Sequence, residues 1–199
     1  LHGHQEGRFF HGYYDCYCYL PLYMFCEDKL LLAKLRTANL DRGHESLPDV
    51  VRVIGQIRAH WPKVRIILRG DSGFCREDLM RWCEENEVLY IFGIARNSRL
   101  LKRIFKELKK ARKRYFEQKK PQRIFKDFTY RTLNSWSRRR RVVGKAEYLA
   151  KGANPRFVVT NLPREVIEAQ SLYEQMYCAR GDMENRIKEQ QLYLFADRT

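Results

Sequence analysis

The chain has 199 residues, of which 44% are hydrophobic, so it is long enough to bury the core of one domain of moderate size. Its 39 Lys and Arg residues outnumber 24 Asp and Glu residues, giving a formal net charge of +15. This excess favours a polyanionic partner, nucleic acid before an anionic membrane, although a generally basic soluble protein is the plain alternative. No apolar run approaches the length of roughly eighteen residues that a transmembrane helix needs, which excludes such a helix.

The first part of the chain is predicted to form a β-hairpin followed by a helix. Tyr, Phe and Cys crowd residues 9–26, a composition typical of strands, and a turn at 27–29 leads to a second strand at 30–35. Ser46 is predicted to cap a helix that Pro62 ends. The N-terminal residues 1–5 contain neither an initiator Met nor a signal-peptide pattern, so we expect a piece of a longer protein.

The middle of the chain alternates strands and helices. Residues 64–68 form a nearly continuous apolar run, typical of a strand buried on both faces of a sheet. An amphipathic helix is predicted at 76–86, a further strand at 88–95, and a long basic helix at 98–120. This order predicts an α/β fold with a mixed or parallel sheet and right-handed crossovers.

The last third is predicted to be rich in strands before a final helix. Alternating stretches at 123–133 and 138–149 predict antiparallel strands, and a short strand follows at 156–162. From Arg164 the pattern is helical to Leu194, with a bend at Gly181. The predicted parts are a core over 1–120, a β-rich insertion over 121–161 and a final helical region over 162–199.

Asp71 is the first candidate for chemistry, because it follows a predicted strand and has Gly70 and Gly73 on either side. The C-terminal ends of strands are where α/β sheets place their ligands, and glycines allow the backbone to turn sharply there. The structural alternative is that Asp71 or Ser72 caps the helix beginning near Arg76.

The second candidate is a helix face near the end of the chain. Tyr177, Arg180, Glu184 and Lys188 are spaced 3, 4 and 4 residues apart, so a regular helix aligns them. They form either an exposed ladder of ion pairs, worth a few tenths of a kcal/mol, or a metal-binding carboxylate beside cations that hold phosphates. Arg180 is suited to bidentate contact with phosphate.

Three stretches together carry a resemblance to a known family: HGHQEGRFFHGYYDCYCYLPLY (2–23), LRGDSGFCRED (68–78) and YCARGDMENRIKE (177–189). Over essentially its whole length the chain resembles bacterial insertion-sequence transposases of the DDE type. It is most similar to the insertion-sequence family thirteen-eighty, which is related to the insertion-sequence-four group. Tyr177, Arg180 and Glu184 match that group's Tyr-x2-Arg-x3-Glu-x6-Lys signature, but Lys188 follows Glu184 by four residues and the seventh residue is Gln191.

The resemblance implies an α/β fold with a ribonuclease-H-like core, a mixed sheet with flanking helices, and a β-rich insertion before the last helix. It implies that Asp71 and Glu184 are catalytic and bind metal, with Mg²⁺, or Mn²⁺ in its place, as the cofactor. The first Asp of the triad and the first core strand are expected upstream of Leu1. Asp15 is interpreted as a turn residue instead.

The function implied is a DNA transposase catalytic domain, whose full-length parent cleaves and strand-transfers insertion-sequence ends. This fragment is expected to be inactive on its own. The expected partners are double-stranded DNA, as terminal inverted repeats and target, and a second copy in a homodimer, without a membrane. The expected setting is the bacterial cytoplasm at the nucleoid.

Contacts to DNA phosphates are expected from Tyr177, Arg180, Lys188 and the run Arg138, Arg139, Arg140 and Arg141. The basic helix over 98–120 is equally well a solvated face or a further DNA contact. The alternatives to a transposase are a stand-alone metal-dependent nuclease, a non-catalytic DNA-binding remnant, and a protein that binds RNA by charge.

Overall fold

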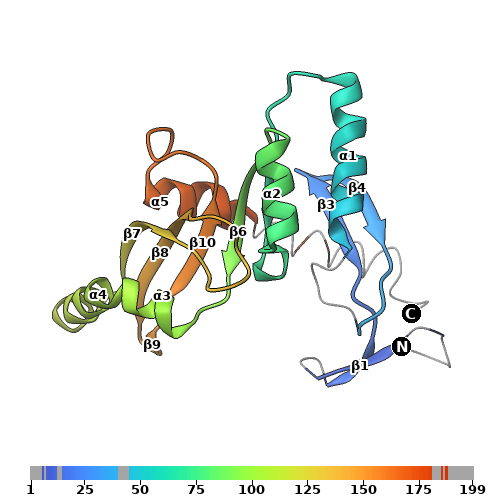
Figure 1. The fold of residues 1–199 in the computed structure, drawn as a ribbon. Helices are drawn as coiled ribbons and strands as arrows, with labels where there is room; N and C mark the ends of the chain where they lie inside the picture. Colours follow the sequence, from blue (N-terminus) through green and yellow to red (C-terminus); the bar gives the residue numbers. More distant parts are fainter. Residues whose placement is uncertain are drawn as a thin grey trace. The chain divides into compact units, whose positions relative to one another are not determined.

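The computed structural model describes residues 6, 8–12, 15–39, 45–180, 185 and 187. The chain forms two compact units, shown in Figure 1. We call Leu1–Val64 with Arg180–Thr199 the hairpin unit, and Arg65–Ala179 the sheet unit. None of the helices in the described ranges has both the length and the apolar character needed to cross a bilayer.

The hairpin unit contains two antiparallel strand pairs where one hairpin was predicted, because residues 9–26 form three short strands rather than one. Asp15 and Glu27 lie in turns with left-handed backbone, at φ 50° and φ 53°, and each comes shortly before the second strand of its pair. Asp15 is therefore a turn residue, as predicted; Asp tolerates this conformation better than most residues. The strands are β1 (Phe9–His11), β2 (Cys16–Cys18), β3 (Leu22–Cys26) and β4 (Lys29–Lys34).

Helix α1 (Ser46–His60) follows in the same unit and ends before Pro62, as predicted. The predicted N-cap was wrong by one residue. Glu45, with left-handed backbone at φ 55°, occupies the cap position, and Ser46 is the buried first residue of the helix. Asp49 in the first turn accepts a hydrogen bond of 2.9 Å from Lys34 Nζ, which ties the helix to β4.

The sheet unit is built on a mixed sheet, which confirms the predicted α/β class. The strand order is β5-β6-β10-β8-β7, with β9 paired to β8. Strands β5 and β6 are parallel, and the other neighbours are antiparallel. The strands are β5 (Ile67–Gly70), β6 (Leu89–Ile94), β7 (Gln122–Tyr130), β8 (Arg140–Leu149), β9 (Gly152–Ala153) and β10 (Arg156–Thr160).

Strands from both sides of residue 120 share this one sheet. Strand β10 pairs with β6, so the segment predicted as a β-rich insertion extends the sheet that begins at β5. The predicted division into a core over 1–120, an insertion over 121–161 and a final helical region over 162–199 stays a prediction. In the structure, the strand that leads to Asp71 and the strands of 121–161 are parts of the same hydrogen-bonded layer.

Strand β5 differs from its prediction in position and burial. It runs over Ile67–Gly70 rather than 64–68, because its partner residues on β6 are Leu89–Phe92. It lies at the edge of the sheet among the described strands, and its first three residues are half-buried rather than enclosed on both faces. As a result the strand ends directly at Asp71.

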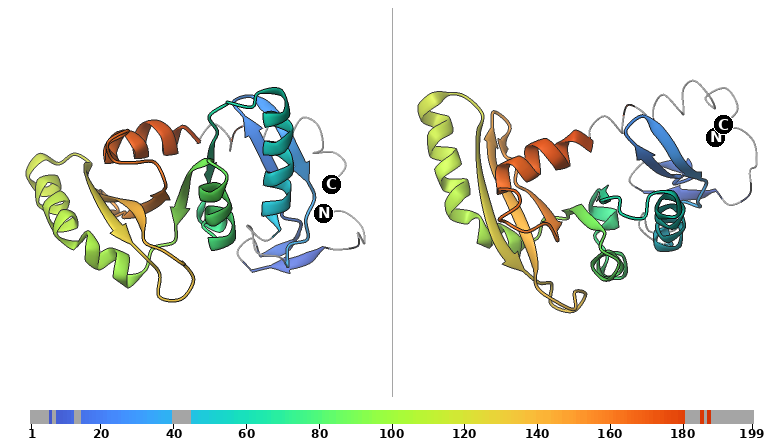
Figure 2. Two further views of the ribbon diagram at one scale, coloured as in Figure 1. Left: turned by 45° about the horizontal axis from the view of Figure 1, so that its top comes forward. Right: turned by 90° about the horizontal axis from the view of Figure 1, so that it is seen from above.

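Helices cover both faces of the sheet, and Figure 2 shows α4 and the segment from Ala169 on opposite sides of it. Neighbouring side chains of β6 point to opposite faces of the sheet. Tyr90 donates a hydrogen bond from its hydroxyl to Glu84, which lies on the helix before β6, whereas Ile91 packs in the core with residues of the final helical segment. The helices are α2 (Glu77–Glu85), α3 (Ser98–Arg103), α4 (Phe105–Gln118) and α5 (Ala169–Ser171), which continues as a π-helical turn η2 (Leu172–Tyr177) and a 3₁₀ turn η3 (Cys178–Arg180).

Two predicted helices have different bounds in the structure. The long basic helix is broken at Ile104, whose buried side chain packs beside Gly144 of β8. The final helix begins at Ala169 rather than Arg164. Arg141 accounts for the late start, because its guanidinium donates to the carbonyl oxygens of Leu162, Pro163 and Ile167 at 2.8–3.0 Å and holds that segment irregular.

A buried carboxylate network joins β7, β8 and the segment between β9 and β10, and it makes the stability of the sheet unit depend on pH. The side chain of Glu147 is 3% exposed. It accepts hydrogen bonds from Arg123 at 2.6 Å, Lys145 at 2.6 Å and Asn154 at 2.7 Å. Burial alone would raise the pKa of Glu147, but the bonds from Lys145 and Arg123 outweigh it and hold the pKa below its usual value.

We expect Glu147→Gln to remove part of this pH dependence. A lowered folded-state pKa stabilises the fold above the unfolded pKa of about 4.3, and this contribution is lost as pH falls through the folded value. At pH 7 the variant leaves Lys145 buried without its anion, so it should be less stable by about 3 kcal/mol. Urea unfolding between pH 7 and pH 3 should show the gap closing in acid, while Glu117→Gln, at an exposed ion pair, should follow the wild type. A constant gap at all pH values contradicts the role given to Glu147.

Candidate functional site

The candidate site begins at the C-terminal end of β5, where Asp71 opens a short 3₁₀ turn, η1 (Ser72–Phe74). Asp71 Oδ1 accepts a hydrogen bond of 2.8 Å from the Gly73 backbone N–H, and the residue is half-buried. The structural alternative expected for Asp71 was the cap of the following helix. Asp71 does not cap α2, which begins at Glu77 after Arg76, but it is the N-cap of η1 through its bond from the Gly73 N–H.

Tyr177 reaches this turn from the final helical segment. A Cβ atom placed on Gly93 of β6 would lie 2.7 Å from Tyr177 Oη, 3.1 Å from the Ser72 backbone nitrogen and 3.3 Å from the Asp71 carbonyl carbon. The bare backbone of Gly93 therefore admits the tyrosine hydroxyl beside the Asp71 turn. Two of the predicted site residues, Asp71 and Tyr177, are thus brought together.

The segment carrying Tyr177 is fixed to the strand carrying Asp71. Arg69 on β5 donates from Nη1 to the carbonyl oxygen of Met176 at 2.9 Å. The ring of Tyr177 also packs against that of Tyr173, with centroids 5.5 Å apart. Tyr177 ends a π-helical turn and Arg180 ends a 3₁₀ turn, so the regular helical spacing predicted for this face is absent between them.

Sequence analysis missed Gly93 and Arg69, although both adjoin Asp71 in space. An isolated glycine within a predicted buried strand marks a close approach of another group, which was a usable signal for Gly93. Arg69 carried no such signal, because its partner is a backbone carbonyl 107 residues away.

The remaining predicted metal and phosphate ligands are not placed here. Glu184 and Lys188 lie outside the described residues, as does the side chain of Arg180. Among the residues that the structure does describe, no three His, Cys, Asp or Glu side chains gather as a metal site requires. Asp71 is a suitable oxygen donor for Mg²⁺, but it does not by itself form a site. The assignment of metal to Asp71 and Glu184 stays a prediction.

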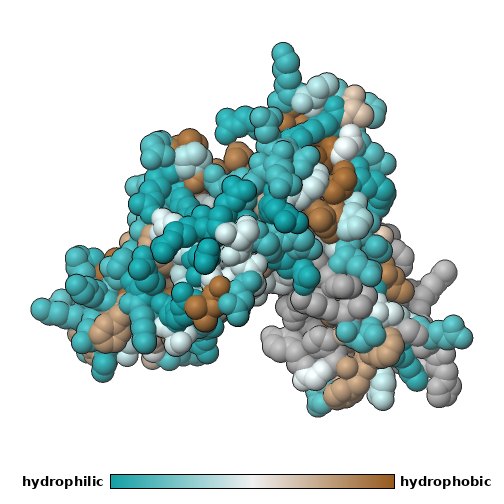
Figure 3. All heavy atoms as spheres, viewed as in Figure 1, coloured by the Kyte–Doolittle hydropathy of each residue, from teal (hydrophilic) through white to brown (hydrophobic). Residues whose placement is uncertain are grey.

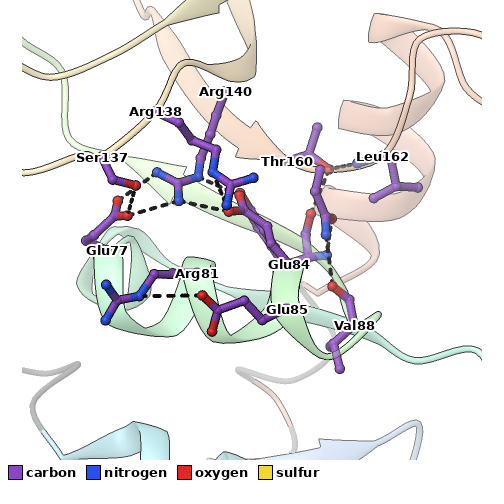
Figure 4. Close-up of polar contacts among 12 residues, drawn as sticks. Glu77, Arg81, Glu84, Glu85, Val88, Ser137, Arg138, Arg140, Thr160 and Leu162 are labelled. Carbon is purple, nitrogen blue, oxygen red and sulfur yellow. Dashed lines mark hydrogen bonds and ion pairs between the residues drawn. The ribbon is translucent and has the colours of Figure 1, made fainter.

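The four arginines predicted to contact DNA occupy different environments. Arg140 is buried and donates to Glu77 and Glu84 at 2.6–3.2 Å, as Figure 4 shows. Arg141 is 9% exposed and pairs with Asp127 at 2.6 Å. Arg138 lies 3.3 Å from Glu84, with an exposed side chain. Arg139 is exposed and has no ion pair with any described residue. The fold therefore uses Arg140 and Arg141 internally.

We expect Gly93→Ala to destabilise the protein by about 1–3 kcal/mol, the usual cost of overpacking a buried position. The new methyl group would press on Tyr177 Oη and on the Ser72 backbone, and only the hydroxyl can move easily. Gly55→Ala is the matched control. Nothing lies within 4 Å of its Cβ position in α1, so it should gain about 0.5–1 kcal/mol from helix propensity.

Urea denaturation of the two variants measures both effects. Combining Gly93→Ala with Tyr177→Phe should recover part of the loss, because the closest contact is then absent. Equal stability of Gly93→Ala and the wild type would show that the tyrosine does not lie against this glycine.

Comparison with known families adds one finding. A sequence profile of the family described as Transposase DDE domain group 1 matches residues 1–199, the whole chain. No curated protein matches the chain.

Proposed function

We propose that this protein acts as a DNA transposase domain, because the chain belongs to the family of transposase DDE domains, group 1. Its mixed sheet with flanking helices is compatible with such a domain. At a finer level, we propose a ribonuclease-H-like core and membership of the insertion-sequence family thirteen-eighty, on the three motifs quoted above. The reaction proposed is cleavage and strand transfer at the ends of an insertion sequence.

The observation that most supports catalysis is the position of Asp71. It stands at the C-terminal end of a parallel strand, the edge at which α/β sheets hold ligands. Its carboxylate accepts a hydrogen bond from the Gly73 N–H, which orients it, and Tyr177 lies beside the same turn. A carboxylate fixed by backbone in this place is suited to a metal-dependent phosphodiester reaction.

Asp71 and Glu184 are proposed to hold Mg²⁺ or Mn²⁺. A divalent metal would supply positive charge beside the phosphate and would lower the pKa of a bound water or hydroxyl. Tyr177, Arg180 and Lys188 are proposed to hold the DNA backbone next to the cleaved bond. Within the arginine run, the proposal of DNA contact is narrowed to Arg138 and Arg139, because their side chains are exposed, whereas those of Arg140 and Arg141 are 2% and 9% exposed and are held by carboxylates of the fold. A homodimer on two element ends completes the proposal.

The test is DNA cleavage by the complete gene product on a plasmid that carries the element ends. We expect cuts at those ends with Mg²⁺ or Mn²⁺, joined products when target DNA is added, and no reaction in EDTA. Cuts scattered over the plasmid favour the stand-alone nuclease. DNA binding without cleavage under any metal favours the non-catalytic remnant.

A further inference from the structure

A basic cleft lies in the sheet unit, away from Asp71. It has a volume of ≈ 630 Å³ and is formed by α3, the end of β7 and the loop that leads to β8. Five cationic side chains line it, and no Asp or Glu of the described ranges does. We call this set the basic cleft: Arg99, Lys102, Arg103, Arg131 and Arg139. Figure 3 shows that the surface over α3 and the neighbouring loop is mostly hydrophilic.

Within the described part of the chain, the cations of the basic cleft have no acidic partner, whereas the neighbouring arginines do. Arg138, Arg140 and Arg141 each pair with a carboxylate at 3.3 Å or less. None of the five cleft side chains forms an ion pair with any residue for which the structure gives a position, and all five residues are exposed. Carboxylates of the fold therefore neutralise Arg138, Arg140 and Arg141, whereas the positive charges of the basic cleft are not neutralised by described residues.

Two of the cleft arginines are held in place by aromatic rings. The Arg99 guanidinium lies over Tyr130 at 5.4 Å from the ring centroid, and that of Arg103 lies over Phe128 at 5.3 Å. Such stacking fixes a guanidinium plane without neutralising its charge. Arg103 also donates from Nη2 to the Thr129 carbonyl oxygen at 3.5 Å, and its remaining N–H groups can bind an anion. The cleft is thus partly ordered before a ligand binds.

Five like charges around one hollow repel one another, and an anion with several charges relieves that repulsion. The cations extend from a helix to a loop on the far side of the cleft, so a ligand with repeated charges fits better than one small anion. We propose that the basic cleft binds the sugar–phosphate backbone of duplex DNA. The choice of DNA as the polyanion rests on the proposed function, whereas the presence of an anion site rests on the charges alone.

The basic cleft is separate from the Asp71 turn. Tyr130 at the cleft ends β7, at one edge of the sheet, whereas Asp71 follows β5 at the other edge. Neither Asp71 nor Tyr177 lines the cleft, so the cleft should govern affinity without touching the chemistry.

The test is DNA binding by the complete chain in EDTA, measured by fluorescence anisotropy on a duplex. We expect the triple variant Lys102→Gln, Arg131→Gln and Arg139→Gln to raise Kd about tenfold or more at 100 mM salt. The slope of log K against log salt should become shallower by about 2.7, because each phosphate that a cation neutralises contributes about 0.9 to it. The matched control is Lys63→Gln, Arg65→Gln and Lys151→Gln, which removes the same charge from exposed positions outside both the cleft and the basic helix. It should change Kd much less.

A second measurement uses the wild-type protein and needs no variant. Bound duplex DNA should protect Lys102 from acetylation more strongly than Lys151, an exposed lysine outside the cleft. Equal Kd values for the two triple variants, or equal protection of the two lysines, would overturn the proposal. Tighter cleft-dependent binding of duplex RNA than of duplex DNA would overturn it as well. Because binding is measured without metal, an absence of cleavage would count against the proposed function and leave the basic cleft standing.

Discussion

Replacing Asp71 with Asn is expected to lower the rate of DNA cleavage by about 10³-fold or more while leaving the fold intact. Asn has the shape of Asp, and its amide oxygen can still accept the hydrogen bond from the Gly73 N–H. The variant therefore removes the negative charge and keeps this hydrogen bond. Metal-assisted charge stabilisation is worth several kcal/mol, and about 4 kcal/mol corresponds to 10³ in rate.

Three measurements separate catalysis from folding in this variant. Cleavage of end-containing plasmid gives the rate, thermal unfolding gives the stability, and calorimetric titration with Mn²⁺ reports binding independently of turnover. Ser72→Ala is the control, because Ser72 is the exposed neighbour of Asp71 in the same turn. We expect it to cleave at nearly the wild-type rate. Wild-type cleavage by Asp71→Asn would end the assignment of Asp71 to the catalytic set.

Most elements of the sheet unit could be predicted from local patterns. The alternation along β7 and β8, and the periodicity of α2, identified these elements to within a few residues. Local patterns do not report which strands pair, however. Strand β10 lies between β6 and β8, and this placement makes the predicted insertion part of the same sheet as Asp71. That outcome depends on contacts between residues far apart in the chain.

The errors at the ends of elements have a common physical cause, which is a tertiary contact that outweighs local preference. Ile104 interrupts a strongly helical sequence because its side chain is buried beside Gly144. Arg141 delays the final helix because it binds three carbonyl oxygens there. Neither contact changes the hydrophobic periodicity of the sequence, so it could not be predicted from that pattern.

The place of Asp71 at the end of a strand was predictable, its surroundings less so, and its role in chemistry stays a prediction. Asp71 could be identified because glycines beside a strand-end carboxylate form a recognisable pattern. A run of arginines, in contrast, does not show which members are exposed. Arg139 and Arg140 are adjacent in sequence, yet one lines the basic cleft and the other is buried between two glutamates.

Arg140→Met is expected to be the most destabilising single substitution in the sheet unit, at about 3–5 kcal/mol. The Arg140 side chain is 2% exposed and donates to Glu77 and Glu84, whose side chains are 22% and 11% exposed. Burial alone would raise the pKa of Glu77, but hydrogen bonds from Arg140 and Ser137 hold it below its usual value. Methionine fills similar space and leaves both carboxylates without their main partner.

Urea unfolding at pH 7 measures this loss, which is a large part of the 5–15 kcal/mol that typically holds a domain folded. Arg139→Met is the matched control, since it removes the same charge from an exposed neighbour and should change stability by at most about 0.5 kcal/mol. Adding Glu77→Gln and Glu84→Gln to Arg140→Met should restore part of the loss, because removing a whole buried ion cluster costs far less than removing one member. If Arg140→Met and Arg139→Met unfold at the same urea concentration, the ion cluster of Figure 4 does not hold α2 to β8.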